Sequence, residues 1–290
     1  MPEGLTAPDT RRIDTRPVDP ATAARIEQAE ARAWVDCYAA APAGFARDVG
    51  LGTREVGGAT VISWAATGRR YFSRAIGLGV AQPATEDAID EIVRGYEDVG
   101  ISMFLLQSLP HCRPAEYEGW LRDRGLEPFD AQDRVVRGGE PAPAVRPHGA
   151  RDLRVERVDA GTADEWVAFL ERVYRLETGR WLQRLVGRVG WHPYVVREQG
   201  EIVGARAMFI GTDGFAWWGI DGPVPGLGTD DYEPDAALCE YMLRDGLDLG
   251  VRCFLADIEV PAEAMDTPAY GYFGELGFRR PYVRTHFARM

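Results

Sequence analysis

The sequence predicts an α/β (α+β) protein built from two modules that are divergent copies of one unit. The first observation is an ordered repeat, in which Gly100 matches Gly250 and Phe104 matches Phe254, each pair lying 150 positions apart. The second is a composition of 46% hydrophobic and 27% charged residues, which is typical of a chain that buries a full core. The third is a length of 290 residues, enough for two domains of ordinary size.

Both copies are expected to follow one order of elements. An amphipathic helix comes first, since apolar residues recur at helical spacing. A glycine ends this helix, and a short buried strand, a loop, a second helix stopped by Gly125 or Gly277 and a last strand follow. Upstream, residues 55–64 and 198–207 predict hairpin-forming strands. The apolar helix positions are Ile89, Ile92, Val93 and Tyr96 in the first copy and Leu238, Tyr241 and Met242 in the second.

A stretch rich in proline and glycine, residues 138–149, marks the boundary between the copies because it has no periodicity. We therefore expect an N-terminal module at 17–138, a linker at 139–151 and a C-terminal module at 152–290. Residues 1–16 are polar and contain prolines, which predicts a loose segment.

The charge pattern excludes several function classes. The net charge of −12 and the pI of about 4.9 argue against nonspecific binding to nucleic acids or to anionic membranes. No apolar run approaches the roughly 18 residues that a membrane helix needs, and the N-terminus has no signal-peptide pattern. Four scattered cysteines predict free thiols in a reducing compartment, and four dispersed histidines predict no metal site. We expect a cytoplasmic protein.

The end of the chain carries a family resemblance. Residues 267–278 read Thr-Pro-Ala-Tyr-Gly-Tyr-Phe-Gly-Glu-Leu-Gly-Phe and look like the closing motif of the GNAT acyltransferases. The order of elements over residues 152–290 is similar as well, and the first copy resembles the same fold more faintly. The resemblance implies tandem GNAT-like modules, each a mixed, splayed, mostly antiparallel sheet flanked by helices, with the second module as the active one.

The resemblance also implies a chemistry, the transfer of an acyl group from a pantetheine thioester to an amine. In the family a pantetheine arm lies between the fourth and fifth strands, which here are about residues 215–221 and 253–260. The acceptor amine attacks the thioester directly, with a general base, a general acid for the thiolate and backbone N–H groups on the carbonyl oxygen.

The loop that binds the coenzyme A pyrophosphate departs from the family pattern. In residues 222–235, Pro223 and Pro225 lack N–H groups, no arginine is present, and carboxylates crowd the start of a helix. An acyl-carrier protein would bring the phosphopantetheine arm without the nucleotide. We therefore expect an N-acyltransferase of bacterial specialised metabolism that passes an acyl group from a carrier protein or coenzyme A to a small-molecule amine.

Acidic residues supply the candidate general base. Asp257 and Glu259 are two positions apart on a strand, so both side chains point to one face, and each raises the pKa of the other. The alternative is an exposed strand end or a structural arginine partner. Asp221, at the end of the aromatic strand, and His192, before another strand, are weaker candidates, since a loop histidine is more often simply solvated.

Two tyrosines are candidates for the general acid. The family places this tyrosine five residues before the final Phe, a position that Phe273 occupies here. Tyr272 and Tyr270 are its neighbours, and a shifted register would bring one of them into the role.

The aromatic strand at 215–221 is the predicted wall for the donor and the substrate. Trp217 and Trp218 are adjacent, so one faces the core and the other faces the opposite side. One of them is expected to line the acceptor pocket; the alternative is that both are packed. Gly219 and Ile220 follow them at the expected place of the pantetheine arm.

Arg180, Arg184 and Arg188 recur at every fourth position, which predicts a basic stripe on one helical face. Such a stripe suits an acidic carrier protein or an anionic group of the substrate. The alternative is a solvated helix face neutralised by nearby acids.

Two other functions remain open at this point. One is a repurposed GNAT fold that performs non-acyl chemistry, such as decarboxylation or cyclisation, with the Asp257 and Glu259 carboxylates. The other is a non-catalytic binding module. An open pantetheine channel favours acyl transfer, a closed polar pocket favours the repurposed enzyme, and a filled cleft favours the binding module.

Overall fold

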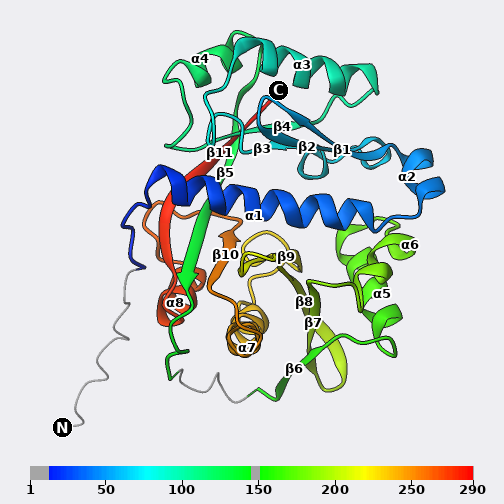
Figure 1. Cartoon of the computed structure of the whole chain (residues 1–290). Helices are drawn as coiled ribbons and strands as arrows, with labels where there is room; N and C mark the ends of the chain where they lie inside the picture. Colours follow the sequence, from blue (N-terminus) through cyan, green and yellow to red (C-terminus); the bar gives the residue numbers. More distant parts are fainter. Residues whose placement is uncertain (1–12, 145–150, 290) are drawn as a thin grey trace.

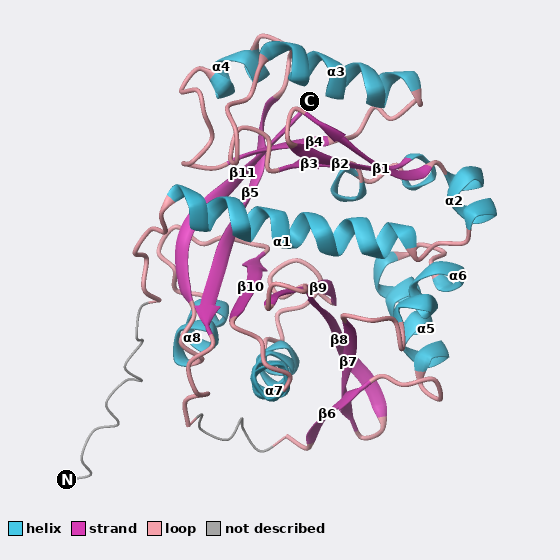
Figure 2. Cartoon of the chain, in the orientation of Figure 1, coloured by secondary structure: helices cyan, strands magenta, loops and turns pink. Residues whose placement is uncertain are grey.

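One sheet passes through the whole molecule in a computed structural model that describes residues 13–144 and 151–289 (Figure 1). The sheet has eleven strands in the order β1-β2-β3-β4-β11-β5-β10-β9-β8-β7-β6. Two neighbouring pairs, β3 with β4 and β9 with β10, are parallel, and the other pairs are antiparallel. Helices flank it (Figure 2). The predicted class, a mixed α/β structure, is confirmed.

The two halves have the same order of elements from their first hairpin onward. The first half contains α1 (Pro20–Ala39), α2 (Ala43–Val49), β1 (Leu51–Val56), β2 (Ala59–Trp64), β3 (Arg74–Ile76), α3 (Glu86–Asp98), β4 (Leu105–Ser108), α4 (Tyr117–Arg122) and β5 (Glu127–Gly138). The second half contains β6 (Leu153–Arg157), α5 (Ala163–Tyr174), α6 (Gly179–Leu182), β7 (Trp191–Glu198), β8 (Glu201–Ile210), β9 (Phe215–Gly222), α7 (Glu233–Asp248), β10 (Cys253–Ile258), α8 (Pro268–Glu275) and β11 (Arg279–Ala288).

Gly100 and Gly250 end equivalent helices in the same way. Their φ angles are +75° and +83°, in the left-handed region that glycine adopts without a Cβ penalty. The following residues, Ile101 and Val251, each donate an N–H bond of 2.9 Å to a carbonyl five residues back. This is the Schellman arrangement, and it explains why the repeat is visible in the sequence.

The last strand of each half pairs with the other half. Strand β5 of the first half lies between β11 and β10, and β11 of the second half lies between β5 and β4. At the centre, Val283 of β11 stands opposite Asp133 of β5. Because the sheet is continuous across both halves, the structure does not test the predicted module boundaries, which stay a prediction. Most of the predicted loose segment, and the centre of the predicted linker, lie outside the described residues.

The two faces of the sheet are covered differently. On one face, α1, α5 and α6 share a single apolar cluster with residues from both halves of the sheet. On the other face, α7 and α8 cover the second half, and α3 and α4 cover the first half, each with a separate cluster. Each half therefore has its own core on one side, and the halves have a common core on the other.

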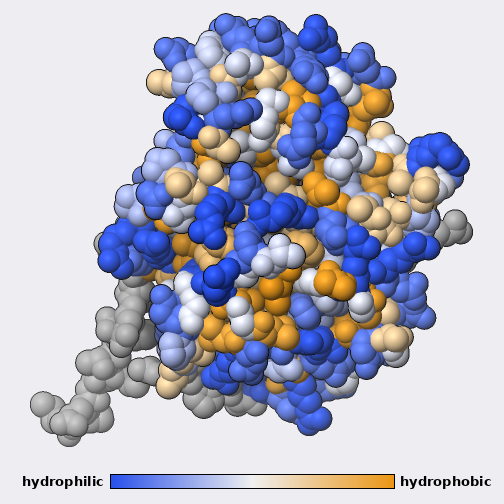
Figure 3. Space-filling view, in the orientation of Figure 1, coloured by the Kyte–Doolittle hydropathy of each residue, from blue (hydrophilic) through white to orange (hydrophobic). Residues whose placement is uncertain are grey.

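Helix α1 joins the halves on the common face. It crosses the middle of the molecule in Figure 1 and contacts β1, β2 and β3 as well as β9. The Asp19 carboxylate caps its start by accepting the N–H of Thr22 at 2.9 Å, with Pro20 in the first turn. Apolar side chains are visible along and beside this helix on the surface (Figure 3).

A buried ionic cluster fastens α1 to the centre of the sheet. Glu27 and Glu30 of α1 meet Arg74 of β3, Arg134 of β5 and Arg284 of β11, and each of these five residues is at most 5% exposed. Arg74 lies 2.7 Å from Glu30, and Arg284 lies 3.3 Å from Glu27. Burial alone raises the pKa of Glu30, but the three guanidinium groups outweigh burial and hold this pKa well below its ordinary value.

The cluster predicts a large loss of stability for Glu30→Gln. Removing one partner of a buried ionic network leaves uncompensated charge, and we expect the free energy of unfolding to fall by about 3–5 kcal/mol. Glu91→Gln is the matched control, because Glu91 pairs with Arg54 at 3.8 Å on the surface and should cost less than about 1 kcal/mol. Urea denaturation measures both; equal losses would contradict the role assigned to the cluster.

Candidate active site

A cavity of 290 Å³ lies between the two halves, on the face covered by α1. We call it the chamber. Its walls come from α1, β2, β3 and β5 of the first half and from α5, α6, β9 and β10 of the second. The aromatic residues that line it are Trp34, Trp64, Tyr71, Phe72, Tyr174, Trp181, Trp217 and Trp218.

The aromatic walls hold one another in place. Trp34 of α1 lies 5.4 Å from Trp217 of β9, and Trp64 of β2 lies 5.1 Å from Trp181 of α6, measured between ring centroids. Both contacts join the two halves. Tilted and edge-to-face pairs of this kind contribute beyond the area they bury, so the chamber is a preformed space.

Strand β9 places its residues by alternation. Trp217 belongs to the apolar cluster on the α1 side, and Trp218 belongs to the cluster under α7 and α8. The alternation then breaks, because Ala207 of β8 stands opposite Gly219 while Ala205 stands opposite Gly222, so that β9 has one extra residue. Ile220 lies in this bulge with a φ of +51°, a conformation that a β-branched residue rarely adopts.

Strands β9 and β10 diverge at the chamber. Their parallel pairing covers only residues 215–217 and 253–255. Beyond that point Asp221 of β9 and both Asp257 and Glu259 on the β10 side line the chamber. The two carboxylates expected on one face of this strand therefore do lie at one cavity.

Asp257 has structural partners. Its carboxylate lies 2.8 Å from Arg284 and 3.3 Å from Arg134, two arginines of the buried cluster. Burial still raises the pKa of this carboxyl, against the pull of those two cations. The arginine-partner alternative is thus the observed state of Asp257.

Glu259 has no such cation. Its carboxylate accepts a hydrogen bond from the Gln132 amide, and among the side chains that the structure describes, which do not include that of Arg180, no arginine or histidine nitrogen lies within 4.0 Å of it. Desolvation raises the pKa of Glu259 to about 8, and the negative charges of Asp221 and Asp257 add to the shift. A carboxyl group that exchanges a proton near neutral pH, at the wall of a cavity, has the properties of a general acid or base.

The cleft between β9 and β10 is filled on the side of α7 and α8. Arg206 of β8 reaches into it and lies 2.6 Å from Asp221 and 3.1 Å from Asp235. The hydroxyl of Tyr272 donates to Asp235. Only 10 Å³ of free volume is left among these residues. A pantetheine arm therefore has no open path between the two strands in this conformation.

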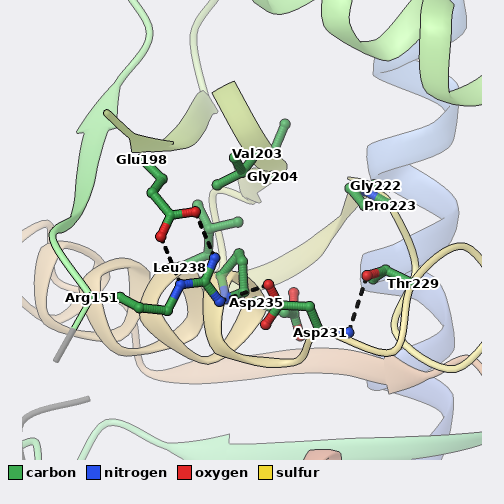
Figure 4. A pocket seen from close by; sticks show the side chains of 12 residues that line it. Arg151, Glu198, Val203, Gly204, Gly222, Pro223, Thr229, Asp231, Asp235 and Leu238 are labelled. Carbon is green, nitrogen blue, oxygen red and sulfur yellow. Dashed lines mark hydrogen bonds and ion pairs between the residues drawn. The ribbon is translucent and has the colours of Figure 1, made fainter. Parts of the chain in front are cut away.

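The start of helix α7 is also occupied by the protein's own charges (Figure 4). Arg151 lines a surface pocket of 200 Å³ there. Its guanidinium lies 2.7 Å from Glu198, 2.6 Å from Asp231 and 3.5 Å from Glu233. One cation is thus shared by three carboxylates, so these residues do not fit a pyrophosphate group.

The equivalent cleft of the first half is closed by backbone. The N–H of Arg113 donates to the carbonyl of Gly79 at 2.9 Å, and the N–H of Ala84 donates to the carbonyl of Arg113 at 2.7 Å. A Cβ at Gly79 would lie 3.0 Å from that same Arg113 carbonyl. The segment around Arg113 therefore covers the loop that precedes α3.

Several predicted site residues lie away from the chamber. The Tyr270 hydroxyl donates to Asp133 at 2.7 Å, and Tyr270 is not among the residues that line the cleft, whereas Tyr272 is. His192 is half-buried in β7, where burial and nearby Arg157 lower its pKa, and it does not line the chamber. The residues next to Tyr270 and His192 in the sequence did not indicate on which face of the sheet these two side chains would lie.

The predicted arginine stripe is wrong in its geometry. Helix α6 ends at Leu182 and a 3₁₀ turn follows, so the three arginines do not share one helical face. Arg184 is exposed, whereas Arg188 lies 2.6 Å from Asp36 of α1. The side chain of Arg180 lies outside the described part. The arginines do recur at every fourth position in the sequence, but helix α6 is too short to include all three of them.

The sequence reasoning missed the residues that the first half contributes. Glu27 and Glu30 fall on the stripe of α1 that also carries Ile26 and Trp34, and acidic residues at apolar helix positions are a readable sign of a buried cluster. No local sequence pattern, by contrast, indicated that Gln132 would contribute to the site.

In the described residues no group of three or more His, Cys, Asp or Glu is arranged to hold a metal ion. None of the described helices has the length and hydropathy to cross a membrane.

Comparison with known proteins identifies the fold. The sequence matches no known family model and has no significant match among curated proteins. The structure is similar to a GCN5-related N-acetyltransferase from Kribbella flavida, with a TM-score of 0.61 and 14% identity over 92% of this chain and 95% of that one. It is also similar to one from Sphaerobacter thermophilus, with a TM-score of 0.53 and 16% identity over 97% and 96%. The chain has the GNAT fold.

The electrostatics of Glu259 predict a pH-dependent gain of stability in Glu259→Gln. Because the pKa is raised from 4.5 to about 8 in the folded state, wild-type stability falls as pH rises through this window, by at most about 1.4 kcal/mol per pH unit. The variant lacks this loss and should be more stable than wild type at pH 9, but not at pH 4.5. Denaturation curves at the two pH values measure this difference, with exposed Glu263→Gln as the control; parallel pH profiles would contradict the assignment.

Proposed function

We propose that the protein is an N-acyltransferase that moves an acyl group from a pantetheine thioester to the amine of a small molecule held in the chamber. The fold supports acyl transfer in general. The observation that carries the proposal is the position of Glu259, whose carboxyl group of raised pKa lies at the chamber wall where β9 and β10 diverge. A base is needed at the point where an amine and a thioester would meet.

In the proposed reaction the amine nitrogen attacks the thioester carbonyl, a C–N bond forms and the C–S bond breaks. Glu259 accepts the proton that the ammonium group or the attacking amine loses. The bulge at Ile220 brings backbone of β9 to the open end of the cleft, where N–H groups would face the carbonyl oxygen. Tyr272, whose pKa burial raises well above its ordinary value, keeps its proton and would give it to the leaving thiolate.

The acyl donor in this proposal is a carrier-protein thioester or acyl-coenzyme A. The carboxylates around Arg151 disfavour the nucleotide part of coenzyme A, which supports a carrier protein, although the ion pair of Arg188 with Asp36 removes part of the predicted docking stripe. Either donor requires the side chain of Arg206, which reaches into the cleft, to move aside. The four free thiols support a cytoplasmic setting, and a role in bacterial specialised metabolism is part of the same proposal.

Glu259→Gln should lower the rate of acyl transfer about 100-fold or more, because a positioned base contributes about 10²–10⁴-fold. The wild-type rate should rise with pH and level off above about pH 8, where Glu259 is ionised. The assay follows thiol release from an acyl-pantetheine thioester with a panel of amines. Glu263→Gln should keep the wild-type profile; an unchanged rate in Glu259→Gln would exclude Glu259 as the base.

Coenzyme A should bind no more tightly than pantetheine, because its pyrophosphate would approach Asp231 and Glu233 rather than a free cation. In the double variant Asp231→Asn with Glu233→Gln, Arg151 keeps only Glu198 as a partner, and the affinity for coenzyme A alone should rise. Calorimetry with both ligands measures this. A clear preference of the wild type for coenzyme A would show that the α7 site binds the nucleotide after all.

A second candidate function is non-acyl chemistry on a molecule in the chamber, such as decarboxylation or cyclisation. The carboxylates of Asp257 and Glu259 at the chamber wall favour it, whereas the filled cleft of the second half and the covered loop of the first favour the non-catalytic binding module. The thiol-release assay separates the two: product formed without thiol release supports this second function and excludes acyl transfer.

A further inference from the structure

Among the described residues, the carboxylates in and next to the chamber pair with arginines, except that of Glu259. Glu27, Glu30 and Asp257 are matched by Arg74, Arg134 and Arg284 in the buried cluster. Asp221 lies 2.6 Å from Arg206, which it shares with Asp235 at 3.1 Å. Glu259 is left over, without an ion-pair partner within the described chain. A single positive charge brought in by a ligand would complete the site.

The rest of the wall suits the apolar part of such a ligand. Trp34, Trp64, Phe72, Trp181 and Trp217 surround the space with ring edges and faces from both halves. An aromatic enclosure with a carboxylate attracts an organic cation through the ring quadrupoles as well as through charge. At 290 Å³ the volume equals that of about ten water molecules at ~30 Å³ each, which suits a small molecule.

An anionic ligand is disfavoured by the same residues. Of the basic residues that line the chamber, Arg74 is already bound to Glu30 at 2.7 Å, and Arg69 is exposed. A carboxylate inside would meet Glu259, Asp221 and Asp257 in a space of low polarity, where like charges repel strongly.

We propose that the chamber is a selective site for a small organic monocation with an aromatic or otherwise apolar body, and that Glu259 is its counter-charge. This inference rests on the proposed function, since it names the class of acceptor: an amine that enters as its ammonium form. Binding then exchanges one positive charge for one proton, because Glu259 must ionise to pair with the ligand.

The groups that face Glu259 come from every element packed around it. Asp221 and Asp257 disfavour its ionised form, whereas Arg74 and Arg284 favour that form from a greater distance. The hydroxyls of Tyr71 and Tyr174 donate to Asp130 and to the Asp221 carbonyl, respectively. Burial raises the pKa of both tyrosines well above neutrality, so neither releases a proton near pH 7.

The test is a binding series on the whole protein, read by tryptophan fluorescence and calorimetry without any acyl donor. The probes are phenethylammonium, the neutral 2-phenylethanol, the anionic 3-phenylpropionate and ethylammonium, which lacks the ring. Phenethylammonium should bind about tenfold or more tightly than each of the other three. Calorimetry in two buffers of different ionisation enthalpy at pH 7 should show release of close to one proton.

Two variants test whether the binding preference comes from the charge of Glu259 or from the aromatic walls of the chamber. Glu259→Gln keeps the shape of the side chain and should erase both the preference over 2-phenylethanol and the proton release, whereas Glu263→Gln should change neither. Equal binding of the alcohol or the carboxylate, or no binding of phenethylammonium, would overturn the inference. Selective cation binding without thioester turnover would support the inference and contradict the proposed acyl transfer. Thioester turnover without a preference for the cation would support acyl transfer and contradict the inference.

Discussion

The contact between two glutamates of α1 and three arginines of the sheet is the constraint on which the rest of the structure depends. Arg134 and Arg284 belong to β5 and β11, the strands that the halves exchange, and Arg74 belongs to β3. Desolvated charges must be paired, so α1 has to lie over this point of the sheet. The same placement brings Trp34 against Trp217 of the other half and thereby closes one wall of the chamber.

The cluster also sets the charge of the chamber. Because Arg134 and Arg284 are held by Glu27, Glu30 and Asp257, their charge does not reach Glu259 as a direct ion pair. Gln132 bridges the two, accepting a hydrogen bond from Arg284 at 2.8 Å and donating one to Glu259. The result is a structural carboxylate, Asp257, next to a titratable one, Glu259, on the same strand face. Their chemistry differs because their partners differ.

The chamber does not coincide with the cleft that the GNAT fold offers for a ligand. The GNAT fold supplies a cleft in each half, and here both clefts are occupied by the protein's own groups, Arg206 with Tyr272 in one and the Arg113 segment in the other. The chamber lies between the halves and is lined by residues from both. The two halves, joined through β5 and β11, therefore form the chamber at the place where they meet.

The sequence by itself determined the duplicated order of helices and strands and the shared face of Asp257 and Glu259. These features depend on local rules: apolar periodicity, left-handed glycines after helices and the alternation of a strand. Only the tertiary structure decided that β5 and β11 change places, that Glu30 meets arginines more than 40 residues away, and that Arg188 is used by Asp36. Such pairings join distant residues and leave no period in the chain. The prediction of a stripe at Arg180, Arg184 and Arg188 was wrong because α6 ends at Leu182 and a 3₁₀ turn follows, where the local pattern had extended the helix.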